Sequence, residues 1–252
     1  MQLLFGSGAL FGTPQFDATG ATVSNPTPVQ FGVLQNASLD VSFDLKTLYG
    51  QNQFPQAVGR GKGSITGKAS FAQLNGALLN SLFFGQTLTS GITSDVYDTT
   101  GTAVPGSPYQ ITPTVPNSGT WSADLGVRDS NGVPMTRVAS APATGQYSVA
   151  AGVYTFAAAD TTKVMFISFQ YTATSTTAKK STIQNLIMGA APAFRVDLYL
   201  PFQGKSLIFT CPYAIGSKLS LATKNDDFVV PDFDFTCFAD AAGNVLTYAL
   251  SE

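Results

Sequence analysis

Carboxylates are the residues of this sequence whose type and spacing could support chemistry. Asp232 and Asp234 stand two residues apart in a segment that alternates like a strand, so their side chains should share one face. Asp40 and Asp44 are expected to share a face of an earlier strand. Such carboxylates can act in glycoside hydrolysis or bind calcium. They can equally form an ordinary solvated strand face, or line a channel between several subunits with a negative wall.

Other catalytic chemistry has little support. The sequence contains no histidine, which excludes His-based triads and His metal ligands. Cys211 and Cys237 cannot make a zinc site alone; they could pair with each other or be small core residues. The segment GRGKGSITGK at 59–68 departs from the phosphate-loop pattern, because Ala69 stands where Ser or Thr is required. The sequence therefore predicts no catalytic residue, no metal and no cofactor, and the protein is not expected to be an enzyme.

A strand, a polar loop and a helix are predicted one after another in the stretch 38–85. Apolar residues occupy every second position of 39–45, which predicts a strand with one dry and one wet face. The segment 50–63 is too polar and too rich in glycine to be buried, so we expect a projecting loop. Apolar residues at helical spacing predict a helix over 71–84. Its inward-facing positions are Phe71, Leu74, Leu78 and Leu82.

The remaining segments predict a β-rich insertion within a second β fold. Residues 1–37 form an arm that contains a first strand within 29–35, and the arm either docks on a neighbour or frays. Short strands divided by turn signals fill 87–177, whereas regular alternation resumes at 194–200. We therefore expect a core of 29–85 and 181–252, with 87–177 inserted.

Smaller elements are predicted in the C-terminal part of the chain. The segment 183–188 is expected to be a short helix or strand, and 215–222 a short helix. The segments 228–239 and 245–251 are expected to form a closing hairpin.

The composition limits the classes of function. Only 11% of the residues are charged, well under the usual quarter, while 44% are hydrophobic and can form a core. Low charge favours a surface covered by copies of the same chain over an extracellular β-protein with a Ser/Thr-rich surface. The net charge of −2 gives no basic signature for nucleic-acid binding, and no apolar run is long enough to span a membrane. The first residues, MQLLFGSGALFG, lack the features of a signal peptide, so assembly in a cytoplasm is expected.

Three segments of the chain carry a resemblance to a known family: KTLYGQNQFPQAVGRGKGSITGKASFAQLNGALLNSLFFG from Lys46, VPMTRVASAPATGQYSVAAGVYTFAAAD from Val133 and LATKNDDFVVPDFDFTCFADAAGNVLTYALSE from Leu221. They resemble the major tail tube proteins of long-tailed bacteriophages, or close relatives among the structural tail proteins. The resemblance covers most of 38–252. It implies a mainly β fold, namely a tail-tube-type β-sandwich or barrel with one flanking α-helix and a β-rich insertion on the outer face.

The resemblance also implies a structural role in the virion tail. Copies of the chain would form hexameric rings that stack into the hollow tube through which viral DNA passes, after assembly in the host cytoplasm. Expected partners are further copies, the tape measure, terminator and tip proteins of the tail, and double-stranded DNA without sequence-specific binding; no membrane is expected. The main sheet would form the inner wall, where an acidic surface repels the DNA backbone. The candidates that would face this lumen are Asp40, Asp44, Asp232 and Asp234.

The resemblance places the contact between stacked rings in the loop between two early strands. Arg60 and Lys62 could become ordered there against an acidic surface of the next ring. The candidate residues are Gly50, Gln51, Asn52, Phe54, Pro55, Gly59, Arg60, Gly61, Lys62 and Gly63.

Two alternatives remain open at this point. The chain could have another virion role, as a capsid decoration protein or a tail terminator, which predicts binding to capsids or single rings without tubes. It could also be a carbohydrate-binding or hydrolytic β-sandwich that uses aromatic residues and paired Asp on an exposed face. That alternative predicts a monomer that binds glycans.

Overall fold

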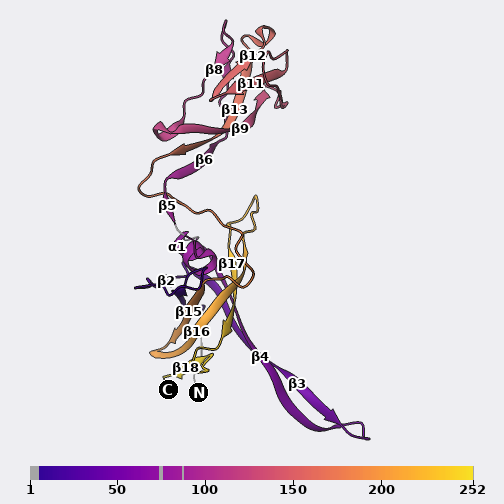
Figure 1. Ribbon diagram of the computed structural model, residues 1–252, viewed down its shortest axis with the longest axis vertical. Coiled ribbons are helices and arrows are strands. Elements are labelled where there is room, and N and C mark those ends of the chain that lie inside the picture. Colours follow the sequence, from indigo (N-terminus) through magenta and orange to yellow (C-terminus); the bar gives the residue numbers. More distant parts are fainter. Residues whose placement is uncertain (1–5, 74–75, 87, 252) are drawn as a thin grey trace. The chain divides into compact units, whose positions relative to one another are not determined.

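Strands dominate the computed structural model of this chain, which describes residues 6–251 apart from 74, 75 and 87. Strands account for 52% of the residues and helices for 6%, which confirms the predicted mainly β fold. The chain divides into two units (Figure 1). Residues 1–87 and 181–252 form the core unit, and residues 88–180 form the inserted unit.

The core unit contains one eight-stranded antiparallel sheet. Strand β18 (Thr247–Leu250) pairs with the first half of β16 (Lys205–Ser220) and lies off the main path of the sheet. Along that path the order is β2 (Val29–Gln30), β1 (Ala9–Phe16), β15 (Ala193–Phe202), β16 (Lys205–Ser220), β17 (Asp232–Phe238), β4 (Pro55–Phe71) and β3 (Leu34–Tyr49). Successive side chains of each strand point to opposite sides, so this sheet has two distinct faces.

One face of the sheet forms the core of the unit. Phe233 and Phe235 of β17 are buried on this face, and the ring of Phe235 lies directly over Gly67 of β4. A Cβ at position 67 would stand 2.1 Å from Cζ of Phe235, so the strand needs a glycine there. The helical segment α1 (Gly76–Leu78) and the π-helix η1 (Leu79–Phe84) pack against the same core. Each buried leucine of these turns contributes about 1.5–3 kcal/mol to stability.

The helix is shorter than the predicted helix over 71–84. Phe71 is the last residue of β4, and Leu74 lies outside the described residues. The helical turns end at Gly85, which has the left-handed conformation that favours glycine (φ +60°). Phe71, Leu78 and Leu82 are all fully buried in one cluster, so they face inward as predicted.

Several smaller predictions are wrong because strand pairing overrides local sequence preference. The segment 215–222 is mostly strand, since β16 continues to Ser220 between β15 and β17. Residues 183–188 have no regular secondary structure. The last strand, β18, pairs with β16 and forms no closing hairpin with β17. Residues of the expected arm form β1, whose ladder with β15 satisfies their backbone groups.

The inserted unit has two small sheets and its own core. Side chains alternate along strand β13 (Val164–Ala173), so that Met165, Ile167, Phe169 and Tyr171 are buried while its other face is only half-buried. The first sheet contains β6 (Ile92–Val96), β7 (Thr102–Ala103), β9 (Thr120–Asp129) and β13 (Val164–Ala173). The second contains β8 (Gln110–Ile111), β10 (Thr136–Arg137), β11 (Gln146–Ala150) and β12 (Val153–Phe156). A separate short pair joins β5 (Thr89–Ser90) to β14 (Lys179–Lys180).

Candidate functional site

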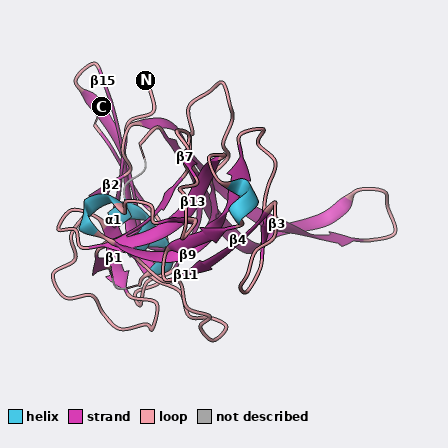
Figure 2. Cartoon of the chain, turned by 90° about the horizontal axis from the view of Figure 1, so that it is seen from above, coloured by secondary structure: helices cyan, strands magenta, loops and turns pink. Residues whose placement is uncertain are grey.

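A two-stranded extension of β3 and β4 is the most unusual feature of the core unit. Strand β17 pairs with β4 only over Ile65–Ser70, whereas β3 pairs with β4 as far as Tyr49 and Pro55. The two strands therefore continue beyond the rest of their sheet, as Figures 1 and 2 show. We call residues 42–64 the hairpin.

The structure corrects the predicted loop at 50–63. Only residues 50–54 connect the two strands, and β4 begins at Pro55. Cross-strand hydrogen bonds satisfy the backbone groups of this glycine-rich segment that face β3, which the polar composition alone did not indicate. At Gly63 the missing side chain leaves room for Phe43, because a Cβ there would stand 2.9 Å from the Phe43 ring.

The apolar stripe of the core continues onto the hairpin. Ala37 and Leu39 of β3 pack against the core, and the same face carries on to Val41 and Phe43. Val41 is 50% exposed and Phe43 46% exposed. Further exposed apolar side chains of the hairpin are Leu45, Leu48, Tyr49, Phe54 and Val58. The described chain itself therefore leaves this stripe half uncovered at Val41 and Phe43, and Phe54, in the connection, is 80% exposed.

The predicted basic residues lie on the hairpin strand rather than on a loop. The guanidinium carbon of Arg60 stands 4.6 Å from the centre of the Phe43 ring, in a cation–π contact. This contact holds Arg60 along the hairpin. Lys62 is exposed on the same strand.

The opposite face of the sheet is polar and collects three of the four predicted lumen residues. Asp232 and Asp234 alternate with buried phenylalanines, and Asp40 reaches the same face through its pairing with Thr66. Asp44 lies in the hairpin beside a register shift, away from the other three. Successive rows across the face are Asp40–Thr66–Thr236, Ser38–Lys68–Asp234–Lys218 and Asn36–Ser70–Asp232–Ser220.

Lysine and arginine side chains accompany the carboxylates on this face. Lys68 Nζ stands 3.2 Å from Asp232 Oδ2 in an ion pair. The hydrogen bond from Ser70, followed by the contact with Lys68, lowers the pKa of Asp232 below its usual range. Arg195 and Asp197 form a second pair at 2.8 Å on the same face of β15. Positive and negative groups therefore alternate here.

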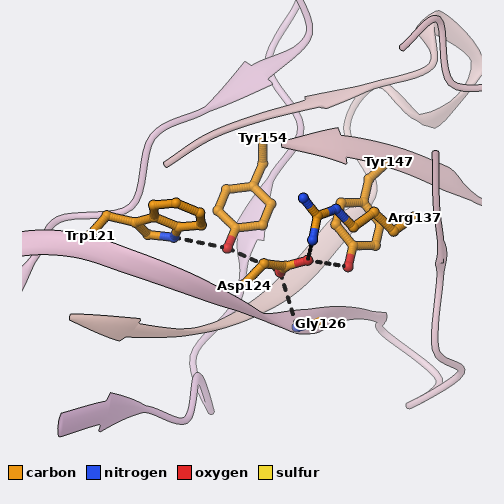
Figure 3. Close-up of polar contacts among 6 residues, drawn as sticks. All are labelled: Trp121, Asp124, Gly126, Arg137, Tyr147 and Tyr154. Carbon is orange, nitrogen blue, oxygen red and sulfur yellow. Dashed lines mark hydrogen bonds and ion pairs between the residues drawn. The ribbon is translucent and has the colours of Figure 1, made fainter. Parts of the chain in front are cut away.

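The inserted unit contains a buried polar cluster that was not predicted from the sequence (Figure 3). Asp124 on β9 is only 4% exposed, and it accepts hydrogen bonds from Tyr147 (2.8 Å), Tyr154 (3.2 Å) and the backbone N–H of Gly126 (3.0 Å). Arg137 Nη1 lies 3.6 Å from the second carboxylate oxygen. Burial, and then the contact with Asp124, keeps the pKa of Tyr147 above its ordinary value. These side chains come from four strands, so no spacing along the sequence predicts that they meet.

The chemistry of the Asp124 cluster is structural. Both carboxylate oxygens are occupied and shielded from solvent, so they have no place for a proton from an outside molecule. Trp121 packs against the core of the inserted unit and donates through Nε1 to the hydroxyl of Tyr154 at 3.3 Å. The cluster ties β9 to β10, β11 and β12.

The two cysteines belong to the core of the other unit. Cys211 and Cys237 are free and buried on neighbouring strands, in agreement with the prediction of small core residues. A hydrogen bond between the thiols, together with burial, raises the pKa of Cys237. Cys237 therefore remains an unreactive thiol at neutral pH.

Comparisons with known proteins give no family for this chain. No protein-family model matches the sequence, and no curated protein matches it. Residues 6–73, 76–86 and 88–251 contain no helix long and apolar enough to cross a membrane. The same described residues contain no group of three or more Cys, Asp or Glu side chains that could hold a metal ion. The hairpin and the polar sheet face are thus the main evidence on function.

Proposed function

We propose that this chain is a structural virion protein of a long-tailed bacteriophage, with no enzymatic activity, and that it forms the tail tube. The exposed apolar stripe of the hairpin carries this proposal. Water penalises a contiguous apolar stripe, so a protein that keeps one needs a partner to cover it. The resemblance described above agrees with this role, and the partner in a tube is another copy of the chain.

Two separate surfaces of the core unit suit ring formation and stacking. Strand β3 ends the sheet and, within the described chain, pairs only with β4, so its outer edge can bond to another strand. Head-to-tail contacts of this kind close into rings when the rotation between subunits allows it. The eight residues 42–49 of β3 span about 25 Å at the usual rise, enough to reach a neighbouring ring. We propose hexameric rings, in line with the resemblance.

The polar sheet face suits the wall of a channel for DNA. Lys68 and Arg195 on this face are paired with carboxylates, so we expect them to bind DNA phosphates only weakly. Double-stranded DNA would pass without sequence-specific binding. The tape measure, terminator and tip proteins are the proposed further partners, and the virion tail the proposed location.

Electron microscopy of the purified protein tests this proposal. We expect hollow tubes or six-fold rings in negative stain as the concentration rises. A variant in which an Asn-Gly turn joins Phe43 directly to Gly63 should lose stacking, because the proposed contact is removed. The two-residue turn fits at this point, since Phe43 and Gly63 already pair across the strands. Val133→Glu, which changes a comparably exposed apolar residue of the inserted unit, is the matched control and should form normal tubes.

The contrary outcomes are equally clear. A wild-type protein that stays monomeric at every concentration, even with a tail-tip extract as nucleus, would contradict the tube proposal. Single rings or capsid binding without tubes would favour the terminator or decoration role instead. Normal tubes from the shortened hairpin would remove the hairpin from the stacking contact.

A further inference from the structure

A groove crosses the outer face of the first sheet of the inserted unit. Its volume is about 460 Å³, within the range of small-molecule sites. It lies over β13. Tyr97, the residue after β6, is on one side of the groove, and the second half of β9 is on the other. Its main lining residues are Tyr97, Leu125, Gly126, Arg128, Met135 and Ser168.

The floor of the groove is low because two small residues meet there. Ser168 of β13 pairs with Gly126 of β9, next to a register shift in the ladder. Gly126 has φ +106°, a conformation that side chains rarely adopt, and a Cβ at this position would meet no atom within 4 Å. The backbone therefore keeps the floor empty, and the space above it is open to a ligand.

One wall of the groove is an aromatic platform held by an arginine. Tyr97 is 67% exposed, and the guanidinium carbon of Arg128 stands 4.6 Å from its ring centre. Arg128 also donates to the backbone oxygen of Asp98 at 3.2 Å and lies 5.9 Å from the Phe166 ring. These contacts fix Arg128 and hold Tyr97 in place at little entropic cost on binding. Leu125, Pro134 and Met135 supply further apolar lining.

The polar groups of the groove balance one another in charge. Asp95 provides a carboxylate that accepts from Gln170 Nε2 at 3.0 Å, Arg128 provides a guanidinium, and Ser168 a hydroxyl. A cation would be opposed by Arg128, and an anion by Asp95. A sugar hydroxyl can donate to the carboxylate and accept from the guanidinium at once, because it is both donor and acceptor.

We propose that this groove binds a neutral saccharide. The apolar face of the sugar ring lies on Tyr97, and its hydroxyls contact Asp95, Arg128 and Ser168. An exposed aromatic side chain with a few fixed polar groups beside it matches this class of ligand better than a charged one. The inference concerns the inserted unit alone, so it goes beyond the tube role and does not depend on it.

Saturation-transfer NMR on the full-length chain tests the site, because it detects weak binding to monomers and to large assemblies alike. The probes are methyl glucoside, methyl galactoside, N-acetylglucosamine and maltotriose. We expect saturation of the aromatic protons to reach the ring protons of at least one sugar. Tyr97→Ala should weaken that binding about tenfold or more, whereas Tyr97→Phe keeps the ring and should retain it.

Two further variants make the test specific. Tyr248→Ala removes a tyrosine that is equally exposed, at 66%, but belongs to the core unit, and it should bind as the wild type does. Ser168→Leu fills the floor without touching Tyr97 and should also abolish binding, with thermal unfolding as the check that the variant folds. Absence of transfer to all four probes, or equal losses in Tyr97→Ala and Tyr248→Ala, would overturn the proposal. Transfer that survives both Tyr97→Ala and Ser168→Leu would place any sugar site elsewhere and overturn it too.

Discussion

The hairpin of the core unit and the Asp124 cluster of the inserted unit differ in how their side chains are exposed to solvent and paired. The hairpin leaves apolar residues such as Val41 and Phe54 in water. The cluster removes a carboxylate from water and supplies it with three hydrogen bonds and an ion pair from within the unit. The contacts of the Asp124 cluster lie within its own unit, so we expect them to stabilise the fold. The exposed side chains of the hairpin are those that the proposed assembly would bury. Substitutions in the two regions should therefore affect different measurements.

The largest effect on stability is expected in the Asp124 cluster. Asp124→Ala leaves two buried tyrosine hydroxyls without their acceptor, so the free energy of unfolding should fall by about 2–5 kcal/mol. Urea denaturation measured below the concentration of assembly gives this value. The matched control is Asp95→Ala, an exposed carboxylate, which should cost less than about 1 kcal/mol. Equal effects of the two variants would mean that the cluster does not stabilise the unit.

A smaller and pH-dependent effect is expected on the polar sheet face. The folded-state pKa of Asp232 is lowered, chiefly by Ser70, so its stabilisation is present above the unfolded pKa near 3.9 and disappears as the pH falls through the folded value. Ser70→Ala should therefore cost about 0.5–1 kcal/mol at pH 7 and progressively less below about pH 4. Ser42→Ala, at an exposed serine of the hairpin, is the control and should show no such pH dependence. A constant loss in Ser70→Ala from pH 7 to pH 2 would contradict the assignment.

The smallest effect on stability is expected in the hairpin, where assembly should change instead. Leu48→Ser replaces a leucine that is already exposed, so the free energy of unfolding of the monomer should stay within about 0.5 kcal/mol of the wild type. The concentration needed for tubes should nevertheless rise about tenfold or more, because that side chain would be buried only between copies. Light scattering follows the assembly. A strong loss of monomer stability would mean that Leu48 stabilises the fold of the single chain, as the Asp124 cluster does, and would contradict the difference proposed between the two regions.

Local alternation was sufficient to predict much of the main sheet. The strand expected over 39–45 lies within β3, and the face that carries Asp232 and Asp234 is opposite the core. Both cysteines are buried core residues, as expected. These features follow from the period-two geometry of a strand, which any alternating sequence must share.

Contacts between distant segments could not be predicted in the same way. Lys68 and Asp232 form their pair across 164 residues of chain, so the sequence near either residue does not show that this sheet face has mixed charge. The Asp124 cluster gathers residues from four strands, and the groove depends on a glycine and a serine that meet only through a ladder. Register decides such contacts, and register is set by the packing of the whole sheet.

The sequence by itself determined the mainly β character of this protein, the dry and wet faces of its main strands, and the lack of histidine-based chemistry. The tertiary structure decided that residues 55–63 form a strand and not a loop, because β3 supplies the hydrogen bonds that a glycine-rich segment cannot supply alone. It also decided which carboxylates have cationic partners and which apolar residues remain in water. Those outcomes depend on neighbours in space, which the order of residues along the chain does not show.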